Sequence, residues 1–237
     1  AVFMTLAFGV LWAQVLGCGR ALGLLTGGAV GICGASAAMA ISAALPESET
    51  KQRYTLFTVI GVTTFSTAAM VFYPIVGDLL QFTSTEMGFF IGATIHDVAQ
   101  VVGAGYSVSP ETGDLATFVK LLRVAMLVPI VMAIALVCRI SSRAQEASQS
   151  SSISFPIFLL GFIALFVLNN TVPLPETLTE GLSHLATALL LLAVTALGVR
   201  TSLREVASIG WRPIILLGGE TLFLAATIAG LLLLGVV

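Results

Sequence analysis

Charged side chains are scarce in this chain, and their scarcity excludes a water-soluble globular protein. Only 9% of its 237 residues are charged, while 57% are hydrophobic. Soluble globular domains carry about 25% charged residues, and a soluble protein so poor in charge could not cover its own surface. The composition therefore predicts a polytopic membrane protein.

Basic clusters and metal-binding patterns are also missing. The ten Lys and Arg residues are scattered and the formal net charge is −2, so no basic stripe exists to hold the phosphates of a nucleic acid. The three cysteines, Cys18, Cys33 and Cys138, lie in or beside apolar runs without the spacing of metal ligands. We expect them to be small core residues and expect no cofactor or metal.

A signal peptide is missing as well. The sequence begins at Ala1, inside an apolar run, without a basic stretch or a cleavage site. We therefore expect the chain to be truncated at its N-terminus. Residues 1–237 are interpreted as a single transmembrane transporter domain that lacks N-terminal helices.

Long apolar segments fill the rest of the sequence. Crossing a bilayer takes about 20 mostly apolar residues. The candidate segments are residues 1–17, 20–45, 54–80, 87–107, 115–139, 153–169, 181–200 and 213–237. The predicted fold is all-α, a polytopic bundle of transmembrane helices.

The distribution of basic residues orients these segments. Basic residues occur in the loops after residues 45, 138 and 199, whereas residues 170–180 have none; they are Lys51, Arg53, Arg139, Arg143, Arg200, Arg204 and Arg212. The positive-inside rule places those three loops in the cytoplasm, and residues 170–180 and the C-terminus outside. Because 54–80 would leave the cytoplasm and 115–139 would return to it, residues 87–107 must cross an even number of times. This favours a broken or re-entrant hairpin at 87–107.

Residues 20–45 are rich in glycine near their middle, at Gly27, Gly28, Gly31 and Gly34. One interpretation is close packing of helices through small residues four apart. The other is a discontinuous helix that forms a site at the membrane midplane. The stretch GASAAMA, residues 34–40, can be aligned with GATIHDV, residues 92–98. Paired interrupted segments favour the discontinuous helix.

An ionisable pair, His96 and Asp97, lies in the apolar stretch 87–107. An ionised Asp at the centre of a span costs roughly 2.5–3.5 kcal/mol, so Asp97 needs a partner, a water-filled cavity or a bound proton. His96 titrates near neutrality unless it is perturbed, and Gln100 shares its helix face. We predict proton coupling at Asp97 and His96, and substrate binding by Thr94, His96 and Gln100. The alternative is a His-Asp pair that caps a helix or is solvated at the membrane surface.

A second candidate group is Gly34, Ala35 and Ser36. A hydroxyl and free backbone N–H groups at a helix N-terminus attract anions without arginine, so we predict that these residues bind an anionic substrate. Lys120 and Arg123 are expected to extend to the membrane interface, with contact to an anion as the alternative. Glu220 is expected at shallow depth, where an interfacial and a functional role are equally supported.

Several motifs together resemble one family. They are GRALGL at 19–24, GICGASAAMA at 31–40, GATIHDVAQVVGAG at 92–105, ALGVRTSLRE at 196–205 and GWRP at 210–213. In this combination and order they resemble the YeiH-type sulfate exporter family of bacterial inner-membrane proteins. The resemblance implies a fold related to the cation/proton antiporter and bile-acid symporter superfamily, with two inverted repeats and crossing broken helices. It also implies transport of small anions such as sulfate or sulfite. Asp97 stands where the family pattern has Glu.

The leading hypothesis is a secondary transporter, an exporter of a small anion such as sulfate, coupled to protons in the bacterial plasma membrane. A cation/proton antiporter on the same fold is the alternative, although such sites usually contain two acids or an acid and a Lys. An intramembrane hydrolase with Asp78 and Asp97 is a remote alternative, because no second catalytic motif accompanies them. We therefore expect no enzyme. The expected partners are a small anion, the lipid bilayer and, as an option, a second copy of the chain.

Overall fold

The computed structural model describes residues 1–145 and 210–235, together with isolated positions between 161 and 192. The predicted segments 153–169 and 181–200, and the predicted outside loop at 170–180, lie outside the described residues apart from those isolated positions. Within the described part the chain is helical and contains no strand. Its helices are α1 (Val2–Val15), α2 (Arg20–Gly31), α3 (Ala35–Ala44), α4 (Lys51–Leu79), α5 (Ser84–Thr94), α6 (Val98–Val108), α7 (Pro110–Ala125), α8 (Leu127–Gln145) and α12 (Trp211–Leu233).

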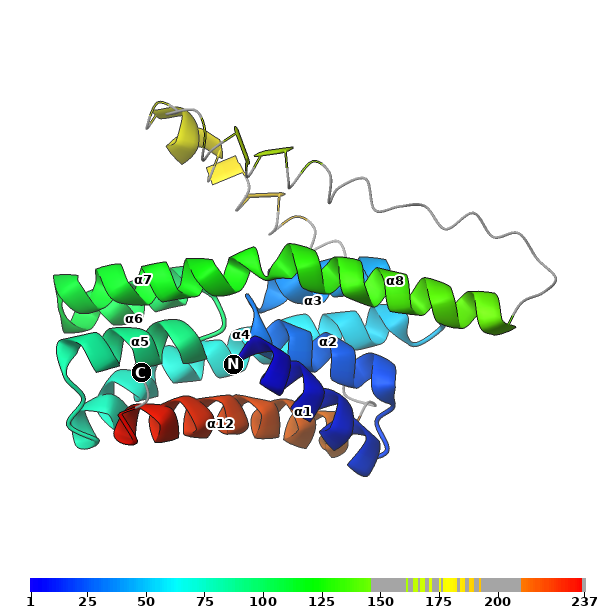
Figure 1. Ribbon diagram of the computed structural model, residues 1–237, viewed down its shortest axis with the longest axis horizontal. Coiled ribbons are helices and arrows are strands. Elements are labelled where there is room, and N and C mark those ends of the chain that lie inside the picture. Colours follow the sequence, from blue (N-terminus) through cyan, green and yellow to red (C-terminus); the bar gives the residue numbers. More distant parts are fainter. Residues whose placement is uncertain are drawn as a thin grey trace.

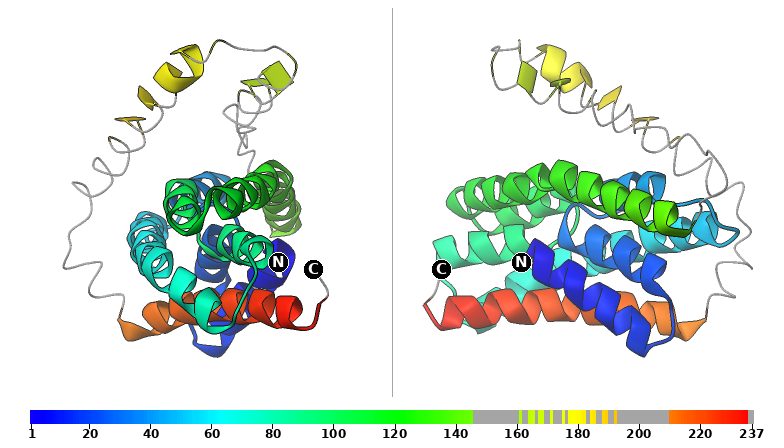
Figure 2. Two further views of the ribbon diagram at one scale, coloured as in Figure 1. Left: turned by 90° about the vertical axis from the view of Figure 1, so that its left-hand side faces the viewer. Right: turned by 45° about the vertical axis from the view of Figure 1, so that its right-hand side comes forward.

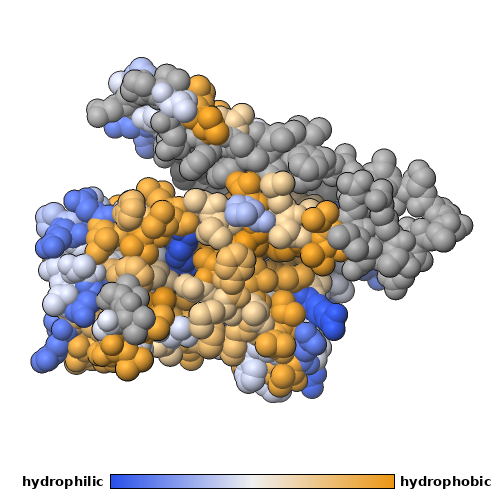
Figure 3. Space-filling model, in the orientation of Figure 1, coloured by the Kyte–Doolittle hydropathy of each residue, from blue (hydrophilic) through white to orange (hydrophobic). Residues whose placement is uncertain are grey.

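Three stretches of the described chain are long and apolar enough to cross a membrane, judged by length and composition. They are Lys51–Leu79, Pro110–Cys138 and Trp211–Leu233. Large apolar side chains lie exposed on them, among them Phe72 of α4, Phe118 of α7 and Leu222 of α12. In Figure 3 apolar residues cover the middle of the molecule, and hydrophilic residues gather toward its two ends. The prediction of a helical membrane protein is confirmed at this level.

Both glycine-rich segments are divided into two helices that turn back on themselves. The segment 20–45 is divided into α2 and α3 at residues 32–34, and the segment 87–107 into α5 and α6 at residues 95–97. In Figure 1 α2 and α3 lie toward the right-hand end of the molecule, and α5 and α6 lie toward the left-hand end. The two hairpins therefore enter from opposite ends and meet near the middle.

The long helices run between those two ends. In Figure 1 α4 runs from the right-hand to the left-hand end, and α7 followed by α8 returns to the right. Helix α12 crosses the bundle obliquely, from right to left (Figures 1 and 2). The basic loops thus lie at one end of the molecule, where α4 and α12 begin and α8 ends. This arrangement agrees with the parity argument from the loop charges.

Small residues let α2 pack directly on α1. A Cβ added to Gly23 would meet the backbone of Gly9 and the side chain of Ala13, and one added to Gly27 would meet the carbonyl of Thr5 at 3.1 Å. The close-packing interpretation of this glycine-rich segment is thus correct. The segment is also discontinuous, with Gly34 at φ +68 at the break, a conformation that favours glycine. The predicted site at this break stays a prediction.

The second hairpin packs on α7 in the same way. A Cβ on Gly92 of α5 would meet the backbone of Ala116, and one on Gly105 of α6 would lie 2.9 Å from the Cα of Gly113. These glycines therefore serve close helix packing. The break itself, at residues 95–97, contains no glycine.

The predicted segment 115–139 begins earlier and is interrupted. The Ser109 hydroxyl accepts a hydrogen bond from the Thr112 N–H, and Pro110 occupies the first helical position, where its missing N–H removes no helical bond. The interruption at Met126 separates α7 from α8. Pro129 follows it, and its lack of an N–H leaves the carbonyl of Ala125 without its helical partner.

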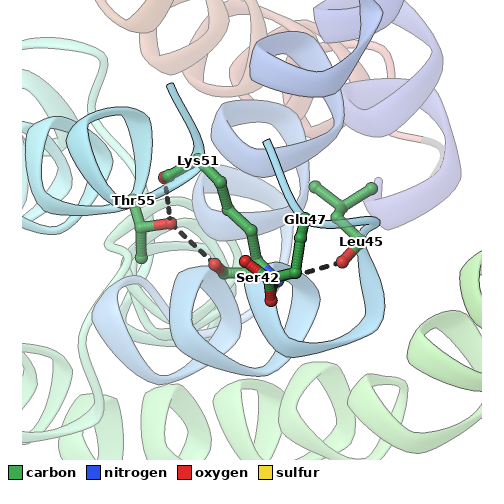
Figure 4. Close-up of polar contacts among 5 residues, drawn as sticks. All are labelled: Ser42, Leu45, Glu47, Lys51 and Thr55. Atoms are coloured by element: carbon green, nitrogen blue, oxygen red, sulfur yellow. Dashed lines mark hydrogen bonds and ion pairs between the residues drawn. The ribbon is translucent and has the colours of Figure 1, made fainter. Parts of the chain in front are cut away.

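The connection between α3 and α4 is fixed by side chains at the end of the molecule (Figure 4). The Lys51 ammonium donates to the Leu45 carbonyl at 3.0 Å and pairs with Glu47 at 2.8 Å. The Ser42 and Thr55 hydroxyls lie 2.7 Å apart, and Thr55 donates to the Lys51 carbonyl at 2.8 Å. Lys51 thereby caps the C-terminus of α3, where a positive charge is favourable.

Candidate functional site

The two hairpin tips touch each other. A Cβ added to Gly34, at the first tip, would lie 3.6 Å from the Cβ of His96, at the second. Lys120 of α7 joins them, because its Nζ donates to the Ile32 carbonyl at 2.8 Å and to the Ile95 carbonyl at 2.9 Å. A single ammonium group thus bonds to both breaks. We call the contact of residues 32–34 with residues 95–97 the tip junction.

Arg123, one turn beyond Lys120, caps the same two helix ends. Its guanidinium donates to the carbonyls of Val30 at 2.9 Å and Gly31 at 2.6 Å, in the last turn of α2. It also reaches the Gly92 carbonyl of α5 at 3.4 Å. The last carbonyls of a helix lack helical partners and carry partial negative charge. Two cations from α7 therefore neutralise the C-termini of α2 and α5 in the interior.

The prediction that Lys120 and Arg123 extend to the membrane interface is wrong. Lys120 is fully buried and Arg123 is 5% exposed. The physical reason is the breaks themselves, since each creates free carbonyls where no water is present to satisfy them. Because Lys120 and Arg123 lie one turn apart on α7, both cations reach the helix ends.

His96 lies in the tip junction, with its side chain fully buried. Its Nε2 lies 3.1 Å from the hydroxyl oxygen of Thr221, on α12. The same hydroxyl oxygen lies 2.9 Å from the Leu217 carbonyl, one turn earlier in α12.

Asp97 is the N-cap of α6. Its carboxylate accepts from the N–H of Ala99 at 2.8 Å and of Gln100 at 3.4 Å, and the residue is half-buried. The preceding backbone is held by Ser66 of α4, whose hydroxyl oxygen accepts from the N–H of His96 at 3.2 Å and of Asp97 at 3.1 Å. The helix-cap alternative therefore describes Asp97 correctly. Its predicted role in proton coupling stays a prediction.

The residues predicted to bind an anion lie at the other tip. Gly34 is the N-cap of α3, and no side chain caps that helix. Ser36 faces outward, and its hydroxyl donates to the carbonyl or the sulfur of Cys33, at 3.1 Å and 2.9 Å. Ala35 is half-buried between them. As a glycine, Gly34 supplies no side chain of its own to the N–H groups in the first turn of α3.

Thr94 and Gln100 lie on either side of the second break. The Thr94 hydroxyl is buried and donates to the Phe90 carbonyl at 2.5 Å, within its own helix. The Gln100 amide nitrogen donates to the Thr67 hydroxyl at 2.9 Å, and its oxygen has no hydrogen-bond partner. The structure therefore brings Gly34 and His96 together, while Thr94 and Gln100 bond to α5 and α4.

Glu220 lies deeper than expected. Helix α12 begins at Trp211 and has 23 residues, so at 1.5 Å per residue Glu220 lies about 13 Å along a helix of roughly 34 Å. Its side chain is fully buried. The expectation of a shallow position assumed a helix that starts near Pro213, whereas α12 starts at Trp211.

Sequence reasoning missed Ser66 and Thr221, which hold the His96 backbone and ring. Hydroxyl side chains are common in these helices, and most bond the carbonyl four residues earlier, as Thr58 and Thr63 do. The sequence gives no signal that separates Ser66 and Thr221 from them. Among the described residues, no group of three or more His, Cys, Asp or Glu side chains could hold a metal ion.

Comparison with known proteins places the chain among bacterial membrane proteins. The sequence family described as "Conserved hypothetical protein 698" matches residues 1–217. UPF0324 membrane protein TauZ from Paracoccus pantotrophus is 45% identical over 99% of this chain and 70% of its own length. A UPF0324 membrane protein from Chlorobaculum tepidum is 43% identical over 97% of this chain.

A third relative, from Rhizobium meliloti, is 46% identical over 99% of this chain and 68% of its own length. The chain spans only 64% of the Chlorobaculum tepidum relative, so about a third of that protein has no counterpart here. No solved structure matches the chain.

Proposed function

The chain belongs to the UPF0324 membrane protein family, and on that premise we propose that it is a secondary transporter of a small anion. Sulfate or a related sulfur oxyanion is the proposed substrate, export the proposed direction and proton coupling the proposed driving force. The proposed location is the bacterial plasma membrane, and a homodimer is the proposed assembly option.

One observation carries this proposal, namely the meeting of two hairpins from opposite ends. Paired interrupted helices that meet at mid-depth are the arrangement in which inverted-repeat transporters place their substrate site. Here the tips meet at Gly34 and His96. Alternating access would then expose the tip junction first to one side of the membrane and then to the other.

The charges at the tip junction favour an anion. The N-termini of α3 and α6 both point toward it, and α3 has no side-chain cap. Lys120 uses two of its three N–H donors on the Ile32 and Ile95 carbonyls, which leaves one for a ligand. An anion at the tip junction would accept hydrogen bonds from the backbone N–H groups of Gly34–Ser36 and from one N–H of the Lys120 ammonium.

Proton coupling is proposed at Asp97 and His96. The Asp97 carboxylate caps α6 and is half-buried. Asn is as good an N-cap as Asp. Asp97→Asn therefore removes the titratable charge while it keeps the helix cap.

The test is transport of labelled sulfate in proteoliposomes that contain the full chain, with and without a pH gradient. Wild type is expected to accumulate sulfate against its gradient when protons flow the opposite way. Asp97→Asn is expected to lose the pH dependence, and Glu111→Gln, which removes an exposed acid at the start of α7, is the matched control. Equal flux and equal pH dependence in Asp97→Asn would remove the proton role from Asp97.

The alternative functions have less support. A cation/proton antiporter would bind its cation at the tip junction, where Lys120 and Arg123 already supply two positive charges. A hydrolase would need Asp78 beside Asp97, but Asp78 lies in the last turn of α4, toward the end of the molecule, and Asp97 lies at the second tip. We therefore propose transport and no enzymatic activity.

A further inference from the structure

The carboxyl group of Glu220 lies in the interior and has no cationic partner among the described residues. It is fully buried, its Oε1 lies 2.8 Å from the Thr26 hydroxyl oxygen, and its Oε2 has no hydrogen-bond partner. The only ion pair among the described residues is that of Lys51 with Glu47. A bare carboxylate oxygen buried in this way is strongly unfavourable, whereas a neutral carboxylic acid is not.

The hydrogen-bond geometry at Thr26 also has room for a proton on the acid. The Thr26 hydroxyl oxygen lies 2.9 Å from the Leu22 carbonyl and 2.8 Å from Glu220 Oε1. The hydroxyl has one proton, and a carbonyl can only accept. If Thr26 donates to Leu22, as threonines in these helices commonly do, Glu220 must donate to Thr26.

The surroundings of Glu220 contain few other ionisable groups. Helices α1, α2, α4 and α5 pack against α12. Helix α1 has no ionisable side chain, α2 has only Arg20 at its start, and α5 has only Glu86 in its exposed first turn. The ionisable side chains of α4 are Lys51, Arg53, Tyr54, Tyr73 and Asp78.

His96 is the ionisable group that the structure links most directly to Glu220. Its Nε2 lies 3.1 Å from the hydroxyl oxygen of Thr221, the residue that follows Glu220. Glu220 therefore lies at the depth of the tip junction, one residue from the side chain that bonds to it. Gly9 of α1 makes room for the acid, since a Cβ at Gly9 would collide with Oε1.

From these contacts we infer that Glu220 is a further proton-binding site, and that it carries the transported proton between the two sides of the membrane. This inference rests on the proposed function for its role in transport, but not for the presence of the proton. In the state described here the acid is protonated and closed in by α1 and α2. Movement of α12 against α1 and α2 would expose it to water, where it releases the proton as a carboxylate.

The presence of the proton can be tested without any transport. Infrared spectroscopy of the reconstituted full chain detects the carbonyl stretch of a buried carboxylic acid, which shifts in D2O. We expect such a band at neutral pH, its loss in Glu220→Gln and its retention in Glu86→Gln, a matched exposed acid. If Glu220→Gln does not fold, Thr26→Val provides the test, because removal of the hydrogen bond should move the band. A band that neither variant changes would overturn the inference.

The transport role has its own measurement. Glu220→Gln mimics the protonated acid, so it should still exchange labelled sulfate for unlabelled sulfate but should not accumulate sulfate in response to a pH gradient. Accumulation equal to that of wild type would overturn the role of Glu220. If wild type exchanges no sulfate at all, the proposed substrate fails, while the infrared result still decides whether Glu220 holds a proton.

Discussion

Arg123 donates two hydrogen bonds to a single oxygen, the carbonyl of Gly31, from Nε at 3.0 Å and from a terminal nitrogen at 2.6 Å. Gly31 is the last residue of α2, so the guanidinium ends that helix from the side, through a group on α7. This contact ties the first hairpin to the helix on which the second hairpin packs.

The geometry predicts that Arg123→Lys is less harmful than Arg123→Met, but not neutral. Lysine keeps the charge and a single donor group, whereas the planar guanidinium reaches three carbonyls at once. Methionine leaves buried carbonyls unsatisfied, at about 1–3 kcal/mol each. Thermal unfolding in detergent should rank wild type above Lys and Lys above Met. A Met variant as stable as the Lys variant would contradict the capping role.

Lys120→Met should destabilise the protein through the two breaks. The carbonyls of Ile32 and Ile95 would lose their ammonium partner, with a loss of about 1–3 kcal/mol for each. Lys51→Met is the matched control, because it also removes a lysine that caps a helix end. Its partner Glu47 is exposed and water can replace the ammonium, so the expected change is about 0–1 kcal/mol. Equal losses of unfolding temperature in the two variants would count against the tip junction as described.

Gly92→Ala should lower stability, whereas Gly230→Ala should not. A methyl group on Gly92 would overlap the backbone of Ala116, which cannot move aside without shifting α7. Gly230 lies in α12 with nothing within 4 Å of its added Cβ, and alanine favours a helix over glycine by about 1 kcal/mol. Unfolding curves of the two variants measure the difference, and a Gly92→Ala protein as stable as wild type would show that α5 and α7 are not in close contact.

Glu86 gives the start of α5 a dependence on pH. The Thr83 backbone N–H and hydroxyl donate to its carboxylate at 2.8 Å and 2.7 Å, and these hydrogen bonds hold the pKa of Glu86 below its ordinary value of 4.5. A lowered pKa means that the stabilisation is complete above pH 4.5 and is lost as the pH falls through the value in the folded state.

Glu86→Gln keeps a side chain that can cap the helix but does not titrate. The difference in unfolding temperature between wild type and this variant should therefore shrink on acidification. It should be constant at neutral and higher pH. A difference that grows as the pH falls would have the wrong sign for a carboxylate cap.

The sequence itself determined the class of protein and two of the segments in which its helices break. Nine per cent charged residues require a bilayer, and the alternation of basic and uncharged loops required residues 87–107 to turn back. The glycines in 20–45 likewise predicted a discontinuous segment, because glycine permits both close helix packing and the positive φ of Gly34. These are local or additive properties, which a single sequence records directly.

Only the tertiary structure decided which side chains bond to the free carbonyls at the helix breaks. From the sequence, Lys120 and Arg123 were expected to extend to the membrane interface. Nothing in α7 itself indicates that free carbonyls of α2 and α5 lie against this helix. Glu220 likewise bonds to Thr26 of α2, a residue far away in the chain, and the sequence does not indicate this contact. Partners of this kind are set by the distances between helices, and the physical reason is the absence of water. In the interior of a membrane protein every free carbonyl and every acid must find its partner on another helix or carry its own proton.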